Sequence, residues 1–128
     1  MHKSISSSAV KKRTGVTRIL YTFLHSFNGF KWLIKNEAAF QQELMLFVPL
    51  TGIACYLDIS ALQTVAVIVS MLFVLFAEMV NTAIEAVVDR VGLDFHRLSG
   101  VAKDIGSALV FLSMVMCVLV WGAVLWSL

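Results

Sequence analysis

Residues 59–90 read ISALQTVAVIVSMLFVLFAEMVNTAIEAVVDR, an uncharged run that leads without a break into an acidic segment. The uncharged part, residues 59–77, is close to the about 20 apolar residues that a helix needs to cross a bilayer. Four residues of the acidic segment share one side of an α-helix, within about 80° of arc at about 100° per residue: Glu78, Asn81, Glu85 and Asp89. Ionisable groups are costly against lipid, so this acidic stripe must face a bundle interior, a watery cleft or a cation. It therefore predicts a functional site at the end of a membrane-spanning helix.

The composition indicates an integral membrane protein with a single domain. Of the 128 residues, 59% are apolar and only 14% are charged, which is far from the average of soluble domains. The uncharged runs lie at residues 44–57, 59–77 and 105–128. The first run is short, so it must begin near Ala38 to span the membrane, and it then carries three polar residues into the interfacial layer: Gln41, Gln42 and Glu43. We expect an all-α fold with three transmembrane helices, at about residues 39–57, 60–80 and 104–127.

The basic residues lie on one side of the predicted membrane. All 10 Lys and Arg residues precede the first run or lie between the second and the third: Lys3, Lys11, Lys12, Arg13, Arg18, Lys31, Lys35, Arg90, Arg97 and Lys103. The turn between the first two runs carries only Asp58. The positive-inside rule therefore predicts a cytoplasmic N-terminus and a C-terminus on the outer side.

The N-terminal part divides into a tail and a predicted surface helix. Residues 1–14 are rich in Ser and Lys and predict a basic flexible tail ahead of a membrane domain of residues 15–128. Seven apolar residues then fall within about 140° of arc: Val16, Ile19, Leu20, Phe23, Leu24, Phe27 and Phe30. This pattern predicts an amphipathic helix at about residues 16–34 that lies in the membrane surface.

A few residues mark the expected helix ends. Asn36 and Glu37 indicate a break before the first span, and Ser60 is a candidate N-cap of the second. Gly92 is expected to end the second helix. Residues 93–100 are then expected to connect it to a third span that begins near Val101.

The predicted bundle is thin, because it contains only three spanning helices. One subunit could hardly enclose so many polar groups, so we expect a homo-oligomer whose subunits bury one another's acidic stripes. Ala102 and Gly106 are small residues that allow close helix approach, although this spacing alone is a weak signal.

The acidic stripe favours chemistry with a hard cation. Carboxylate and amide ligands without His or Cys favour Mg²⁺ over zinc or copper. A nearby cation such as Lys103 would meet phosphate charge, and phosphoryl transfer needs little beyond a metal, a cation and a carboxylate. The sequence has neither a P-loop nor a kinase-type glycine loop, which excludes a conventional nucleotide-binding fold. These residues alone do not decide between catalysis and transport.

The acidic stripe belongs to a longer pattern, Glu78-x-Val-Asn81-Thr-Ala-Ile-Glu85-x-x-Val-Asp89, that resembles the signature of the small prokaryotic diacylglycerol kinases. Two more segments resemble this family, particularly its Gram-negative branch: Asn36-Glu37-Ala-Ala-Phe-Gln-Gln-Glu43 and Leu98-Ser99-Gly100-x-Ala102-Lys103-Asp104. The resemblance implies a homotrimeric kinase of the bacterial inner membrane, with a periplasmic C-terminus and active sites shared between subunits. Such an enzyme transfers the γ-phosphate of MgATP to diacylglycerol and gives phosphatidic acid. The expected partners are ATP, diacylglycerol and membrane lipid, and no nucleic acid.

The resemblance also implies roles for individual residues. Glu78 would be the general base and Asn81 a polar residue that positions the reactants. Glu37 and Glu85 would bind Mg²⁺ and, through it, the nucleotide. Further nucleotide contacts would come from Lys103, Asp104 and Arg18, and lipid contacts from Glu43, Gln42 and Glu78. Position 101 is often basic in the family, so Val101 would remove a phosphate or nucleotide contact.

The same residues leave other interpretations open. The Gram-positive relatives phosphorylate undecaprenol, which also presents a single hydroxyl at the interface. A cation channel would line its path with carboxylates, although the second and third spans carry no charge in mid-membrane. A purely structural subunit would use the acidic stripe as polar contacts between helices. Glu37 is alternatively a helix-end carboxylate favoured by the dipole, and Asp89 a partner of Arg90 or Lys103.

Overall fold

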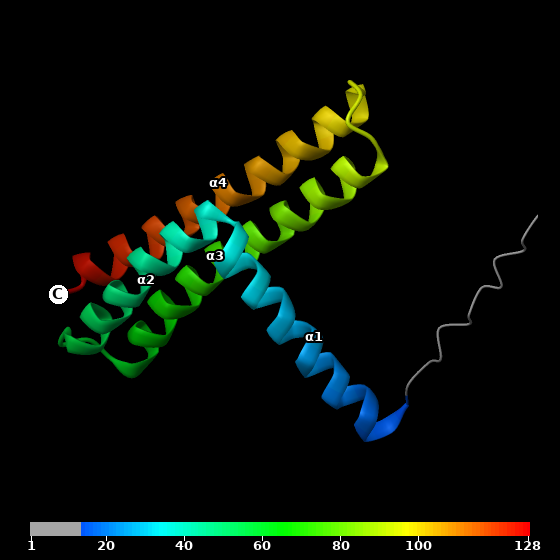
Figure 1. The fold of residues 1–128 in the computed structure, drawn as a ribbon. Helices are drawn as coiled ribbons and strands as arrows, with labels where there is room; N and C mark the ends of the chain where they lie inside the picture. Colours follow the sequence, from blue (N-terminus) through cyan, green and yellow to red (C-terminus); the bar gives the residue numbers. More distant parts are fainter. Residues whose placement is uncertain (1–13) are drawn as a thin grey trace, which may run out of the picture. The chain divides into compact units, whose positions relative to one another are not determined.

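The computed structural model describes residues 14–128, and every regular element in this part of the chain is a helix (Figure 1). The elements are α1 (Gly15–Asn36), α2 (Ala38–Tyr56), α3 (Ala61–Val91) and α4 (Arg97–Trp126). The last three are long and apolar enough to cross a membrane. The predicted all-α membrane fold is therefore confirmed. The predicted tail, residues 1–14, lies outside the described residues except for Thr14.

The described residues divide into two compact units, residues 14–32 and residues 33–128. In the first unit, α1 exposes its large apolar side chains: Val16, Ile19, Leu20, Phe23, Leu24, Phe27 and Phe30. Two of its hydroxyl groups bond within the helix: Thr22 donates to the Arg18 carbonyl and Ser26 to the Thr22 carbonyl, each at 2.9 Å. An exposed apolar side suits a helix that lies in the membrane surface, and this location of α1 stays a prediction.

The ends of α3 are set by the residues that the sequence indicates. Ser60 is the N-cap: its hydroxyl accepts a hydrogen bond from the Gln63 backbone N–H at 3.1 Å, while the Gln63 side chain accepts one from the Ser60 N–H at 3.0 Å. This reciprocal pair satisfies two N–H groups that a helix start leaves free. Gly92 follows the last residue of the helix in an extended conformation. With 31 residues, α3 is about 46 Å long and must project beyond a hydrocarbon layer of about 30 Å.

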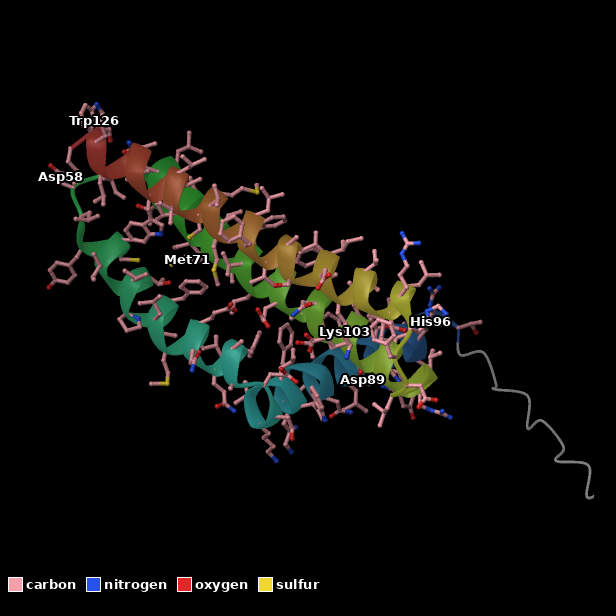
Figure 2. The ribbon with its side chains drawn as sticks, turned by 90° about the horizontal axis from the view of Figure 1, so that it is seen from above. Asp58, Met71, Asp89, His96, Lys103 and Trp126 are labelled. Atoms are coloured by element: carbon pink, nitrogen blue, oxygen red, sulfur yellow. The ribbon has the colours of Figure 1, made fainter. Side chains whose placement is uncertain are left out.

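α3 packs antiparallel against α4 and also contacts α2 (Figure 1). The contacts form two buried clusters: Ala54, Val67 and Val124, then Met71, Val74 and Cys117. Small residues such as Ala54 let helix backbones approach closely, which favours association within a membrane. Figure 2 shows Asp89 and Lys103 at one end of these helices and Asp58 at the opposite end. The acidic stripe therefore ends far from the short turn between α2 and α3.

The connection between α3 and α4 is shorter than the sequence suggests. It covers residues 92–96, because α4 already begins at Arg97. His96 is the N-cap, and its Nδ1 accepts a hydrogen bond from the Leu98 backbone N–H at 3.1 Å. The expectation of a start near Val101 is wrong, since histidine is not among the residues that usually mark an N-cap. Lys103 consequently lies in the second turn of α4.

Candidate active site

The candidate site begins where α1 gives way to α2. Glu37 has an extended backbone (φ −107°, ψ 107°), which produces the break that the sequence predicts. The Gln41 side-chain amide donates to the Ile34 carbonyl at 2.8 Å and satisfies an acceptor that the helix end leaves free. Glu37 is thereby held, partly exposed, at the N-terminus of α2, where the helix dipole favours a carboxylate.

Two carboxylates meet between α2 and α3. Glu43 and Glu78 are 7% and 6% exposed, and their carboxyl groups are close enough to interact directly. The Oε2 atom of Glu43 is buried without a hydrogen-bond partner. Two buried carboxylates repel each other unless they share a proton or a cation lies beside them. Such a pair is costly to bury, which is typical of a functional site.

Glu78 is already covered within one chain, through the contact of α3 with α2. Burial of this side chain therefore does not require another subunit, and the expected homo-oligomer stays a prediction. The remaining members of the acidic stripe are partly or largely exposed: Asn81, Glu85 and Asp89.

Asn81 and Glu85 continue the site along α3. The Asn81 Nδ2 donates to the Glu85 Oε1 at 3.4 Å, which is a long hydrogen bond. The Asn81 side chain also lies beside Glu78, and the charges of Glu85 and Glu37 both act on Glu78. Asn81, the predicted polar residue, therefore contacts both the predicted base, Glu78, and one predicted metal ligand, Glu85. The other predicted ligand, Glu37, reaches Glu78 only through the interaction of their charges.

Lys103 and Asp89 form an ion pair at the polar end of α3 and α4 (Figure 2). Their Nζ and Oδ1 atoms are 2.7 Å apart, and the side chains are 44% and 49% exposed. Exposed ion pairs contribute little to stability, so Lys103 can exchange this partner for a stronger anion. Two more predicted site residues, Asp104 and Gln42, are exposed. Arg18 belongs to the other unit, on α1, and its role stays a prediction.

The donors around Glu78 suit Mg²⁺. They are carboxylate oxygens, and the Glu43 Oε2 is buried without a partner. Within residues 14–128 of one chain, no group of three or more His, Cys, Asp or Glu side chains could hold a metal ion. However, Mg²⁺ is usually bound by one or two protein carboxylates, with water and phosphate oxygens completing its shell. The residues present therefore fit an ion that arrives with a nucleotide.

An apolar groove of about 520 Å³ lies between α2, α3 and α4. Its lining is almost wholly apolar and includes Phe47, Leu50, Cys117 and Trp121. Glu43 is the one charged residue that the described chain contributes to this lining. The groove therefore joins a carboxylate to a surface that suits a hydrocarbon chain.

Three features of the site do not emerge from the sequence analysis. Gln41 closes the junction before α2, although its only signal is a polar residue at the start of an apolar run. The contact between Glu43 and Glu78 has no local signal, because the two residues lie on different helices. Gly106 packs directly against Asn81, whereas its spacing from Ala102 indicates only a close helix approach.

Comparison with known proteins identifies the family of this chain. The family model for prokaryotic diacylglycerol kinase matches residues 24–125. The chain is 45% identical to the diacylglycerol kinase of Escherichia coli (strain K12) over 114 residues. This aligned region covers 89% of this chain and 93% of that protein. It is 40% identical over 121 residues to the diacylglycerol kinase of Pseudomonas aeruginosa, covering 94% and 98% of the two chains. The diacylglycerol kinase of Haemophilus influenzae is 40% identical over 114 residues, covering 89% and 97%. The chain therefore belongs to the prokaryotic diacylglycerol kinase family.

Proposed function

We propose that the protein is a membrane-embedded kinase that transfers the γ-phosphate of MgATP to the free hydroxyl of diacylglycerol and so forms phosphatidic acid. The family supports this activity, because the similar proteins of E. coli and P. aeruginosa are diacylglycerol kinases by name. The observation that carries the proposal is the buried pair of Glu43 and Glu78 beside an apolar groove. An acyl chain in the groove would bring the lipid hydroxyl to these carboxylates.

Glu78 is the proposed general base. It is buried, and its contacts with Glu43 and Asn81 fix the direction of its carboxylate. As the lipid oxygen forms its bond to the γ-phosphorus, Glu78 takes the hydroxyl proton, and ADP leaves with the electron pair of the broken P–O bond. Glu43 would share the transferred proton, because its carboxyl group faces that of Glu78.

Glu37 and Glu85 are the proposed Mg²⁺ ligands. When bound, Mg²⁺ would neutralise charge on the β- and γ-phosphates. Both carboxylates interact with Glu78 through their charges, which supports a metal site near this proposed base. The hydrogen bond from Asn81 would hold Glu85 in the orientation for binding.

Lys103, Asp104 and Arg18 are the proposed nucleotide contacts. A triphosphate carries more negative charge than one carboxylate, so Lys103 would leave Asp89 for phosphate oxygens at little cost. Asp104 follows Lys103 on α4 and is exposed, and Arg18 is exposed on α1. Both side chains are therefore accessible to a water-soluble ligand such as ATP.

We further propose a homotrimer in the inner membrane, with a cytoplasmic N-terminus, a periplasmic C-terminus and active sites shared between subunits. The exposed apolar side chains of α3 and α4 support burial against lipid or other subunits: Leu72, Phe73, Phe76, Phe111, Leu112, Val118 and Leu119. The orientation is supported by Lys103, which lies at the end of the bundle opposite Asp58 (Figure 2).

The activity is tested with purified protein in mixed micelles and a coupled assay of ATP consumption. We expect consumption only when diacylglycerol and Mg²⁺ are both present. Consumption that does not depend on lipid, or none with both present, would contradict the proposal. Undecaprenol at the same mole fraction is the comparison substrate, and a faster rate with this alcohol would overturn the choice of diacylglycerol. Ion flux into proteoliposomes without ATP would instead favour a channel.

A further inference from the structure

Gly106 makes room for a residue of the candidate site. It is buried in α4, and a Cβ added there would overlap the Oδ1 of Asn81 and lie 3.3 Å from its Cγ. A Cβ added at Gly52 or Gly122 would meet nothing within 4 Å. The close contact is therefore particular to Gly106 and is not a general property of the glycines in these helices.

The Asn81 side chain is confined from two directions. Its Nδ2 donates to the Glu85 Oε1 at 3.4 Å, and its Oδ1 occupies the space that Gly106 leaves open. This Oδ1 is buried and has no hydrogen-bond partner. Because buried polar atoms normally find a partner, an unpaired one that stays in place is held there by its surroundings or serves a ligand. The surface of α4 at Gly106 provides this confinement.

We propose that Gly106 is a positioning residue for phosphoryl transfer, because its missing side chain leaves the volume in which the Asn81 carboxamide points its Nδ2 at Glu85. The proposal rests on the proposed function, in which Glu85 binds Mg²⁺ and Glu78 is the base. No curvature or strain of the backbone is needed for it.

The same geometry predicts what a larger residue does. In Gly106→Ala, the atom in the way is the end of a side chain, which can rotate. The Asn81 Cα lies 3.6 Å from the added Cβ, which is an ordinary van der Waals contact. The carboxamide therefore turns away from Glu85 while α3 and α4 keep their spacing.

The kinetic test compares Gly106→Ala with Gly52→Ala, which adds the same methyl group to an exposed glycine of α2. We expect kcat of Gly106→Ala to fall on the order of 10- to 100-fold, because small misplacements of catalytic groups have effects of this size. KM for diacylglycerol should stay within about twofold, since no lipid contact changes. Gly52→Ala should keep the wild-type kcat. A wild-type kcat in Gly106→Ala, or its failure to fold in detergent, would overturn the proposal.

A spectroscopic test follows the Asn81 side chain itself. In protein labelled with ¹⁵N-asparagine, the Asn81 side-chain NH₂ signals are identified by their loss in Asn81→Ala. We expect these signals to shift in Gly106→Ala and to stay in place in Gly52→Ala, while those of Asn28 and Asn36 stay unchanged in both. Unshifted Asn81 signals in Gly106→Ala would overturn the proposal even if kcat falls.

A double variant separates positioning from a loss of helix packing. If Gly106 acts through Asn81, then Gly106→Ala should lower the rate of the Asn81→Ala protein by less than about twofold. Losses that multiply would mean that α4 itself is displaced, and the proposal would fail. If the proposed function itself is wrong, the wild-type protein shows no lipid-dependent turnover. The NMR shift in Gly106→Ala can still be measured in that case, so the two failures are distinguishable.

Discussion

Glu78→Gln separates the chemistry of the site from the stability of the bundle. The substitution keeps the volume of the side chain and replaces one oxygen by an NH₂ group. Glu78 is only 6% exposed and faces Glu43, whose Oε2 has no hydrogen-bond partner. The new amide can donate to this carboxylate, so the substitution removes a repulsion and supplies a missing hydrogen bond.

Glu78→Gln is expected to stabilise the fold and to lower the turnover rate. Two unit charges about 4 Å apart repel by about 4 kcal/mol at an effective dielectric constant of 20, and a shared proton removes much of this. We therefore expect Glu78→Gln to raise the free energy of unfolding by about 1–2 kcal/mol. Loss of a general base lowers turnover by about 10²- to 10⁴-fold, which corresponds to about 2.7–5.4 kcal/mol in the activation barrier.

The assay pairs lipid-dependent ATP consumption in mixed micelles with thermal melting followed by far-UV circular dichroism in the same detergent. Glu43→Gln is the matched control, because it relieves the same repulsion without removing the base. It should melt as high as Glu78→Gln and keep more of the turnover. Turnover of Glu78→Gln within about tenfold of wild type would refute its role as base. Melting several degrees below wild type would refute the repulsion between the two carboxylates.

Two more substitutions test other parts of the account. Lys103→Met breaks an exposed ion pair with Asp89, so the melting temperature should change by less than about 3 °C. KM for ATP should rise at least about tenfold, because a charged contact to phosphate is lost. An unchanged KM would show that Lys103 does not bind the nucleotide. Gln63→Ala removes the side-chain half of the cap, in which Gln63 accepts from the Ser60 N–H, and the 2.9 Å hydrogen bond from Gln63 Nε2 to the Ser127 hydroxyl, while the bond from the Gln63 backbone N–H to the Ser60 hydroxyl remains. This substitution should lower the free energy of unfolding by about 1–2 kcal/mol and leave kcat near the wild-type value below the melting temperature. A stability equal to that of the wild-type protein would show that other contacts hold this end of the bundle.

Features that depend on local chemistry can be predicted from the sequence. The start of α3 follows from the Ser60 hydroxyl and its end from Gly92, because each residue acts on the backbone beside it. The three long apolar helices follow from the uncharged runs. The pairing of Asp89 with Lys103 is one of the alternatives that the sequence leaves open, and the structure selects it.

Features that depend on contacts between helices cannot be predicted in this way. The meeting of Glu43 with Glu78 requires the register of α2 against α3, and no pattern within either helix encodes it. The contact of Gly106 with Asn81 likewise requires the register of α4. The early start of α4 is missed for another reason, because His96 caps it through a ring nitrogen and not through a common capping side chain.

We propose that buried carboxylates at one end of α3 form a site for phosphoryl transfer to a lipid alcohol. The most direct measurement is the transfer of label from [γ-³²P]ATP to dioleoylglycerol by the purified protein, with and without Mg²⁺. We expect labelled phosphatidic acid only when Mg²⁺ is present, and at least about 100-fold less of it with Glu78→Gln. Label released only as inorganic phosphate, or equal labelling of the lipid by Glu78→Gln, would show that these carboxylates do not form such a site.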